Sequence, residues 1–219
     1  MSPEEDQNQY SVLTPEQEAL LAQVCAGDEL DAIEFPTPTW VVPGLIPQGT
    51  GLLVGAPKSG KSYLVLDIAL AAATGGTAFG SIEVGDARDV LILALEDTPA
   101  RLQKRLRDIG DETGIPRRLQ TITEVRTDQV IPLLEAWLST AEGEAPLVII
   151  DTLGKIKTSP KANEGPYAHD YRFISALKNV VDRHPGTSLI LVHHTRKASA
   201  GGSDDDWMND TSGTNGLNG

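Results

Sequence analysis

The feature that most constrains the fold of this chain is a glycine-rich octapeptide, GAPKSGKS, at residues 55–62. Residues 51–54 before it are largely apolar and predict a strand, whereas residues 61–74 after it predict a helix. Two glycines with four residues between them, followed by lysine and a hydroxyl residue, are typical of a loop whose backbone N–H groups surround phosphate. The helix that begins at this loop adds the positive end of its dipole. The pattern therefore predicts a phosphate-binding loop.

The positions of this loop have expected roles in binding ATP and Mg²⁺. Lys61 is expected to reach the outer phosphates and to assist catalysis, and Ser62 is expected to ligate magnesium. A glycine turn without a ligand is the alternative, which the flanking strand and helix disfavour. The residues expected to contact the nucleotide are Gly55, Ala56, Pro57, Lys58, Ser59, Gly60, Lys61, Ser62 and Tyr63.

The rest of the chain alternates apolar runs with helix-forming segments. The expected strands are 51–54, 90–95, 147–150 and 189–192, with a weaker one at 119–125, and the expected helices are 61–74, 99–109, 130–141 and 167–183. Continuous apolar runs of this kind indicate strands that are buried on both faces of a parallel sheet. We therefore predict an α/β fold, with a mostly parallel central sheet in an αβα sandwich. Ligands of such sheets bind beyond the carboxyl ends of the strands.

Acidic residues follow two of these expected strands. Asp151 follows the run LVII and is expected to hold magnesium directly or through water, although a turn or cap role is the alternative. Glu96 follows the run VLILAL and is expected to orient and polarise the attacking water. Glu96 and Asp97 could instead start the next helix, whose capping residue is Thr98. We assign Asp97 and Thr98 to the helix and Glu96 to catalysis.

Two histidines, His193 and His194, follow the last expected strand. Because successive side chains of a strand alternate between faces, at most one of them points along the nucleotide edge. The preferred role is a neutral histidine that senses the terminal phosphate by a hydrogen bond, and a structural histidine is the alternative. Metal ligation is disfavoured because the chain has a single cysteine, Cys25, and no companion spacing. We expect Cys25 to be an apolar filler.

An acidic leader precedes this body. Residues 1–36 hold nine of the 31 acidic residues and no lysine or arginine, which leaves 22 acidic against 18 basic residues in 37–219. Thr14 and Gln17 predict the start of a short helix that reaches about Ala26. Its narrow apolar side would need the body or a neighbouring subunit to pack on. Residues 35–43 read as an extended connector, so the predicted domains are a leader, 1–36, and a core, 37–219.

The longest apolar stretches are too short to cross about 30 Å of hydrocarbon, so we expect no membrane span. The acidic amino terminus leads into no apolar run, which argues against a secretory signal and favours a cytoplasmic location.

Taken in order, the motifs GAPKSGKS, LALEDT, LVIIDTL, LVHHTRK and SGTNGLNG resemble those of the RepA-type hexameric replicative helicases among the RecA-like ATPases. The resemblance spans residues 40–219. It implies a RecA-like fold, with Lys61 and Ser62 on phosphate and magnesium, Glu96 as the catalytic glutamate, Asp151 as a metal ligand and His194 as the strand-end sensor. It also implies a homo-hexameric ring around single-stranded DNA, with ATP held at the subunit boundaries.

The chain departs from the family pattern in two respects. It ends at Gly219, where that pattern continues into further core strands and an arginine that reaches the ATP of the neighbouring subunit. We therefore expect an open sheet edge, and a chain that binds ATP better than it hydrolyses it. The expected DNA-facing loops are also mixed in charge: 154–164 offers Lys155, Lys157 and Lys161, whereas 196–210 offers Arg196 and Lys197 before three aspartates.

Other ATPase and GTPase families fit less well. The guanine-specificity motif of GTPases is absent, one cysteine excludes the zinc ribbon of RadA-type recombination ATPases, and small-molecule kinases usually carry glycine at Lys58. The leading hypothesis is therefore an ATP-driven DNA helicase or translocase subunit that acts in DNA replication. A nucleotide-binding regulatory or interaction module with little turnover, or another RecA-like recombination or repair ATPase, is the alternative.

Overall fold

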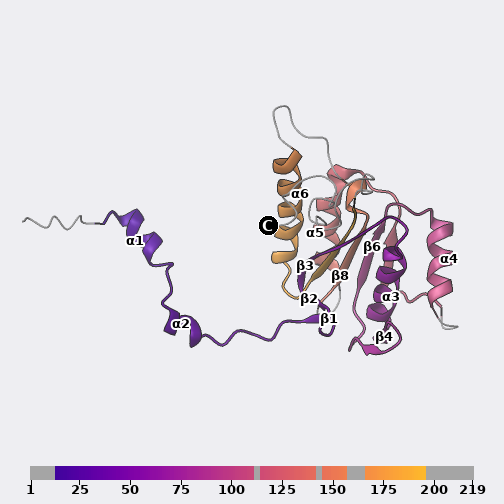
Figure 1. Ribbon diagram of the computed structural model, residues 1–219, viewed down its shortest axis with the longest axis horizontal. Helices are drawn as coiled ribbons and strands as arrows, with labels where there is room; N and C mark the ends of the chain where they lie inside the picture. The colour runs from indigo at the N-terminus through magenta and orange to yellow at the C-terminus, as the bar shows by residue number, and fades with distance from the viewer. Residues whose placement is uncertain (1–12, 111–113, 142–144, 157–165, 196–219) are drawn as a thin grey trace, which may run out of the picture. The chain divides into compact units, whose positions relative to one another are not determined.

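The computed structural model describes residues 13–110, 114–141, 145–156 and 166–195, with the backbone alone for 166–170 (Figure 1). The chain divides into two compact units, Met1–Thr37 and Pro38–Gly219. Among the described helices of both units, none is long and apolar enough to cross a membrane.

The first unit contains two short helices, α1 (Pro15–Leu21) and α2 (Gly27–Asp31). The expected capping box begins α1: Thr14 N donates to Gln17 Oε1 at 2.9 Å, and Gln17 N donates to Thr14 Oγ1 at 3.2 Å. The expected extension to Ala26 is wrong, because α1 ends at Leu21. Neither helix buries a residue, and so short a helix gains little stability without packing. Cys25 is exposed, so its expected role as an apolar filler is also wrong.

The second unit is built on a sheet of five parallel strands in the order β3-β9-β8-β6-β7. The strands are β3 (Gly49–Gly55), β6 (Val90–Ala94), β7 (Leu119–Ile122), β8 (Leu147–Asp151) and β9 (Ser188–His194). The carboxyl ends of β3, β6, β8 and β9 lie at one edge of the sheet, because Gly55 pairs with His194 and Asp151 pairs with both Ala94 and Val192. This edge is where the expected site residues occur.

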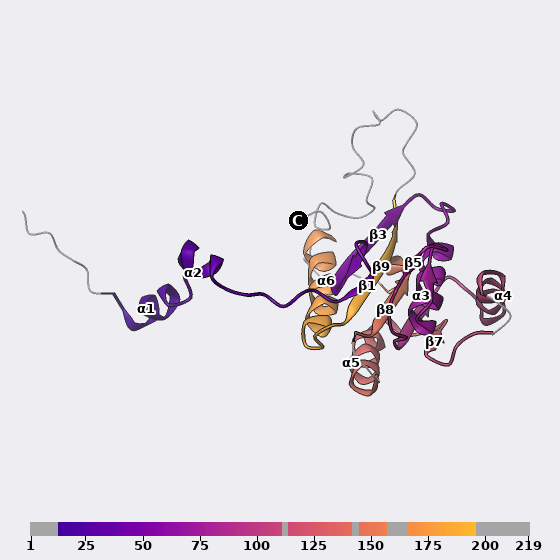
Figure 2. The ribbon, with the colours of Figure 1, turned by 90° about the horizontal axis from the view of Figure 1, so that it is seen from below.

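Helices cover both faces of the sheet (Figure 2). One face packs against α3 (Lys61–Thr74) and α4 (Pro99–Ile109), through a core that includes Val65, Leu102 and Ile149. The other face packs against α5 (Val130–Thr140) and α6 (Pro166–Asp182), through a core that includes Leu134, Leu177 and Ile150. Two 3₁₀ helices, η1 (Thr127–Gln129) and η2 (Leu153–Lys155), lie in the connections. The predicted αβα sandwich is confirmed.

The expected burial of the strand before the phosphate loop is wrong. Within the described residues, β3 pairs only with β9 and is therefore an edge strand, the first in the strand order of the sheet. Leu52 and Val54 on β3 are therefore 38% and 37% exposed, whereas every residue of β6 and β8 is buried. An apolar run identifies a strand, but the position of the strand in the sheet decides whether both faces are covered.

Two small antiparallel sheets complete the second unit. They pair β1 (Trp40–Val42) with β2 (Ile46–Pro47), and β4 (Thr77–Ala78) with β5 (Ile82–Glu83). The expected extended connector at 35–43 therefore ends in a strand, whose Val41 and Val42 are buried in the core of the α3 face.

Candidate nucleotide-binding site

The glycine-rich loop joins the end of β3 to the start of α3, as the sequence predicts. Gly60 has φ +91°, a conformation that side chains rarely adopt, and it directly precedes the first helical residue. At Gly55 a Cβ atom would lie 3.3 Å from Ser59 Oγ and 3.4 Å from Lys61 Cδ. Both glycines therefore allow the loop to close tightly around the amino terminus of α3, where backbone N–H groups lack helical partners.

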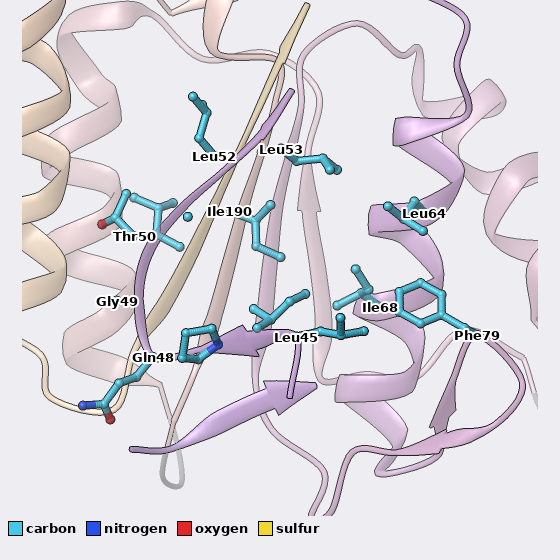
Figure 3. Close-up of a pocket in the computed structure, with 14 residues that line it drawn as sticks. Leu45, Gln48, Gly49, Thr50, Leu52, Leu53, Leu64, Ile68, Phe79 and Ile190 are labelled. Atoms are coloured by element: carbon cyan, nitrogen blue, oxygen red, sulfur yellow. The ribbon is translucent and has the colours of Figure 1, made fainter. Parts of the chain in front are cut away.

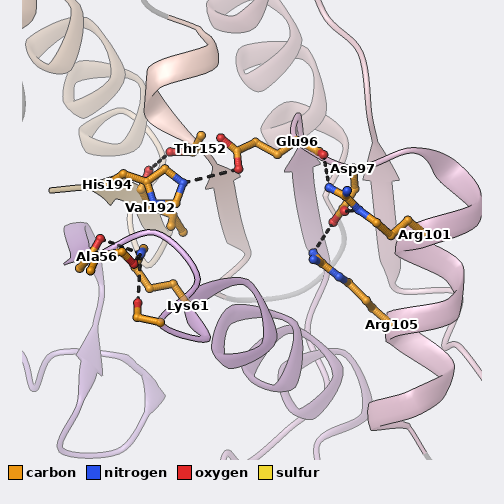
Figure 4. A network of polar contacts seen from close by, with 11 residues as sticks. Ala56, Lys61, Glu96, Asp97, Arg101, Arg105, Thr152, Val192 and His194 are labelled. Atoms are coloured by element: carbon orange, nitrogen blue, oxygen red, sulfur yellow. Dashed lines mark hydrogen bonds and ion pairs between the residues drawn. The ribbon is translucent and has the colours of Figure 1, made fainter. Parts of the chain in front are cut away.

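The side chain of Lys61 lies inside this loop. Lys61 is 7% exposed, and its Nζ donates to Gly55 O and Ala56 O at 2.7 Å each and to Ser59 Oγ at 3.2 Å (Figure 4). Burial lowers the pKa of Lys61 below its ordinary value, and the charges of Asp151 and Glu96 offset only part of this shift. The ammonium group is thus held beside two carboxylates by oxygen atoms of the loop itself.

Asp151 ends β8 as a buried acid, with 6% of the residue exposed. The pKa of Asp151 is raised above its ordinary value, mainly by burial. A hydrogen bond with Ser62 opposes this shift, whereas the nearby charges of Glu96 and Asp97 add to it. Its Oδ1 atom is buried and has no hydrogen-bond partner among the described residues. A buried carboxylate oxygen without a partner is costly unless a cation binds it. Asp151 and Ser62, the two expected magnesium ligands, therefore lie together and fit such an ion.

Glu96 and His194 extend from neighbouring parts of the same sheet edge, after β6 and at the end of β9. Glu96 Oε2 and His194 Nε2 lie 3.5 Å apart (Figure 4). The adjacent His193 is only 4% exposed, as expected where successive side chains alternate. Thr152 Oγ1 donates to Val192 O at 2.7 Å and ties the end of β8 to β9. The carboxyl ends of β6, β8 and β9 thus form one polar cluster beside the loop.

Asp97 and Thr98 serve the start of α4, as expected. Thr98 caps the helix, with Arg101 N donating to Thr98 Oγ1 at 3.3 Å. The side chain of Asp97 is 4% exposed and pairs with two arginines of α4: Arg101 Nε, and Arg105 Nη1 at 2.8 Å. Arg101 also donates through Nη2 to the backbone oxygen of Glu96. These contacts hold α4 against the segment that contains Glu96.

A pocket of about 280 Å³ lies directly over the loop. It is lined by Lys58, Ser59, Gly60, Lys61, Ser62, Tyr63, Arg105 and His194. Seven of these eight residues are expected site residues, whereas Arg105 is one that the sequence reasoning missed. The one local indication in the sequence that Arg105 could lie at this pocket is that Arg101 and Arg105, four residues apart, share a face of the helix that follows Glu96.

A second pocket, of about 320 Å³, lies along β3 and away from this polar cluster (Figure 3). Its lining includes Leu45, Leu53, Leu64, Ile68 and Phe79, and it contains no ionisable side chain. With Gln48 and Thr50 as its polar side chains, it has no charged group to hold a triphosphate and no side chain that could act as a general base.

The loops expected to face DNA are only partly described. Lys155 ends η2 and is exposed, whereas Lys157, Lys161, Arg196 and Lys197 lie outside the described residues.

Comparisons with known proteins identify the family and the fold of this chain. Residues 14–200 match the family described as AAA domain. A DnaB-like replicative helicase, from a structure titled for its interactions with primase, superposes with a TM-score of 0.52 and 14% identity, over 74% of this chain and 43% of that one. A second structure, titled as the ATPase domain of another protein, superposes with a TM-score of 0.51 and 15% identity, over 68% of this chain and 58% of that one. This chain therefore spans about half the length of these structures, and the likeness shows the fold.

Proposed function

Because this chain belongs to the AAA domain family, we propose that it binds Mg-ATP at residues 55–62 and hydrolyses the terminal phosphate. One observation carries this proposal: the Lys61 ammonium is held inside the glycine-rich loop, and the strands that precede Glu96 and end in Asp151 reach the same edge of the sheet as this loop. A cation and two acids at the opening of a glycine-rich loop are the groups that binding and cleaving a triphosphate require.

In this proposal the loop and Lys61 bind the substrate. The backbone N–H groups of the loop and the amino end of α3 donate to phosphate oxygens. The Lys61 ammonium exchanges its present contacts with Gly55 O and Ala56 O for the outer phosphates. Ser62 and Asp151 would hold Mg²⁺, which neutralises phosphate charge when it is bound.

Glu96 is proposed as the general base for the attacking water. Its carboxylate accepts a proton from water while the water oxygen bonds to the terminal phosphorus and the bond to the ADP oxygen breaks. The side chain is 37% exposed, so water can reach it. His194, beside Glu96, donates a hydrogen bond to the transferred phosphoryl group and stabilises the charge that develops there.

At a finer level, we propose that the chain is a subunit of a ring-shaped DNA helicase or translocase that acts in replication. The motif resemblance supports this role, and the replicative helicase found by superposition has the same fold. In such a ring, six copies would surround single-stranded DNA, a neighbouring subunit would supply an arginine to each ATP, and Lys155, Lys157 and Lys161 would contact DNA phosphates.

ATP turnover with and without single-stranded DNA, in the unaltered chain and in Glu96→Gln, tests this role. A motor predicts turnover that DNA stimulates and that the substitution abolishes. Binding of ATP without turnover in either condition would contradict the motor and favour a regulatory module. Replacing Lys155, Lys157 and Lys161 together by alanine should weaken salt-dependent DNA retention and leave ATP binding unchanged.

A further inference from the structure

The loop pocket contains a cationic side chain from outside the loop, which the mechanism above does not use. Arg105 lies in the middle of α4, yet its side chain lines the same pocket as Lys61, Ser62 and His194. We propose that Arg105 is a second cationic contact for the phosphate chain of the bound nucleotide. This inference deepens the proposed function and rests on it.

Two neighbours fix the position of the Arg105 guanidinium group. Its Nη1 donates to Asp97 Oδ2 at 2.8 Å (Figure 4), and its central carbon lies 5.3 Å from the centre of the Tyr63 ring. Tyr63 directly follows Ser62 at the start of α3, so the arginine bridges α4 to the helix that begins at the phosphate loop. The Arg105 side chain is 22% exposed, which makes it partly desolvated but still accessible from the pocket.

The charge balance of this cluster favours an anion. The Asp97 carboxylate is 4% exposed and accepts hydrogen bonds from both Arg101 and Arg105. Among Asp97, Arg101 and Arg105, one negative charge therefore faces two guanidinium groups, so this group of three retains a net positive charge. Because a guanidinium group carries five N–H donors, Arg105 can keep its contact with Asp97 and still bind phosphate oxygens. Asp97 and Tyr63 act as positioning residues.

The exposed Tyr63 ring and the guanidinium group above it could also form a platform for the adenine base. The pocket favours phosphate, because its other lining residues are those of the glycine-rich loop, together with His194. A contact with the adenine base and a contact with phosphate can be distinguished by binding of magnesium tripolyphosphate, which presents the phosphate chain without a base or a sugar.

Calorimetric titration of Arg105→Ala with Mg-ATP and, separately, with magnesium tripolyphosphate tests the assignment. Loss of one charge-assisted contact should weaken both ligands by roughly tenfold or more. Arg105→Lys should give an intermediate affinity for both, because lysine retains the charge but not the planar fork. Arg107→Ala, an exposed site on the same helix, should bind both ligands as the unaltered chain does. Thermal melting of the ligand-free variants checks that each one folds.

Each of three results would overturn the assignment. If Arg105→Ala weakens ATP but leaves tripolyphosphate unaffected, the arginine contacts the base. If both affinities are unchanged, Arg105 forms only a structural ion pair with Asp97. If the unaltered chain binds neither ligand, the proposed function fails as well, whereas normal binding by the unaltered chain and by Arg105→Ala leaves that function intact.

Discussion

Glu96 Oε2 lies 3.5 Å from His194 Nε2, although the two residues are 98 positions apart in the chain. They meet because β6 and β9 flank β8 in the parallel sheet, so that their carboxyl ends reach the same edge. The contact joins the proposed general base to the proposed phosphate sensor.

Glu96→Gln and His194→Ala are therefore expected to be coupled in ATP turnover. Glu96→Gln should lower kcat by about 10²–10⁴-fold, the usual contribution of a general base, while Mg-ATP affinity is maintained. His194→Ala should lower kcat by about tenfold or more, through loss of one hydrogen bond to a charged group. Since both act in one step, the double variant should lose less than the product of the two single effects. Independent, multiplicative losses measured by steady-state kinetics would contradict a shared role.

Asp151→Asn is expected to stabilise the nucleotide-free protein while it abolishes turnover. Burial raises the pKa of Asp151 in the folded chain, so ionising this carboxyl opposes folding. The stability that the protonated form provides is lost as the pH rises through this raised value. At neutral pH, the variant should melt about 2–4 °C higher, the shift that 1 kcal/mol produces in a domain of this size.

The gain in melting temperature for Asp151→Asn should shrink as the pH falls through the raised pKa towards the ordinary carboxyl value. Asp128→Asn, at an exposed aspartate paired with Arg126, is the matched control and should change stability by less than about 0.5 kcal/mol. An Asp151→Asn variant that melts lower than the unaltered chain across the whole pH range would contradict the role of burial.

The edge position of β3 predicts unequal effects for two leucines that face each other in the sheet register. Leu52 on β3 pairs with Leu191 on β9, but Leu52 is 38% exposed and Leu191 is 1% exposed. Leu191→Ala should cost about 2–5 kcal/mol of unfolding free energy, and Leu52→Ala about 1 kcal/mol or less. Denaturant unfolding measures both values. Equal costs would mean that β3 is covered on both faces.

Most helices, and the clustering of the candidate site residues, could be predicted from the sequence for local reasons. The bounds of α3 and α4 agree with those expected, because Gly60 and Gly75 bracket α3, and Thr98 and Pro99 begin α4. The strand-end acids Glu96 and Asp151 could be found because a parallel sheet brings such positions to one edge.

Two features that could not be predicted from the sequence depend on contacts between distant segments. Exposure of Leu52 depends on which strand lies at the sheet edge, and a local apolar pattern carries no information about strand order. The presence of Arg105 at the pocket depends on how α4 packs beside α3, which brings that arginine over the ring of Tyr63. Neither relationship is encoded in residue spacing.

The most direct measurement is the binding of labelled ATP, in the presence of magnesium, to the unaltered chain, to Lys61→Ala and to Lys178→Ala. Lys61 is buried within the loop, whereas Lys178 is an exposed lysine of α6 that does not line the loop pocket, and it serves as the control. We predict that the unaltered chain and Lys178→Ala bind ATP, and that Lys61→Ala loses at least about tenfold in affinity, the least expected for a charged contact. No binding by the unaltered chain, or the same affinity after Lys61→Ala, would contradict the proposed phosphate site.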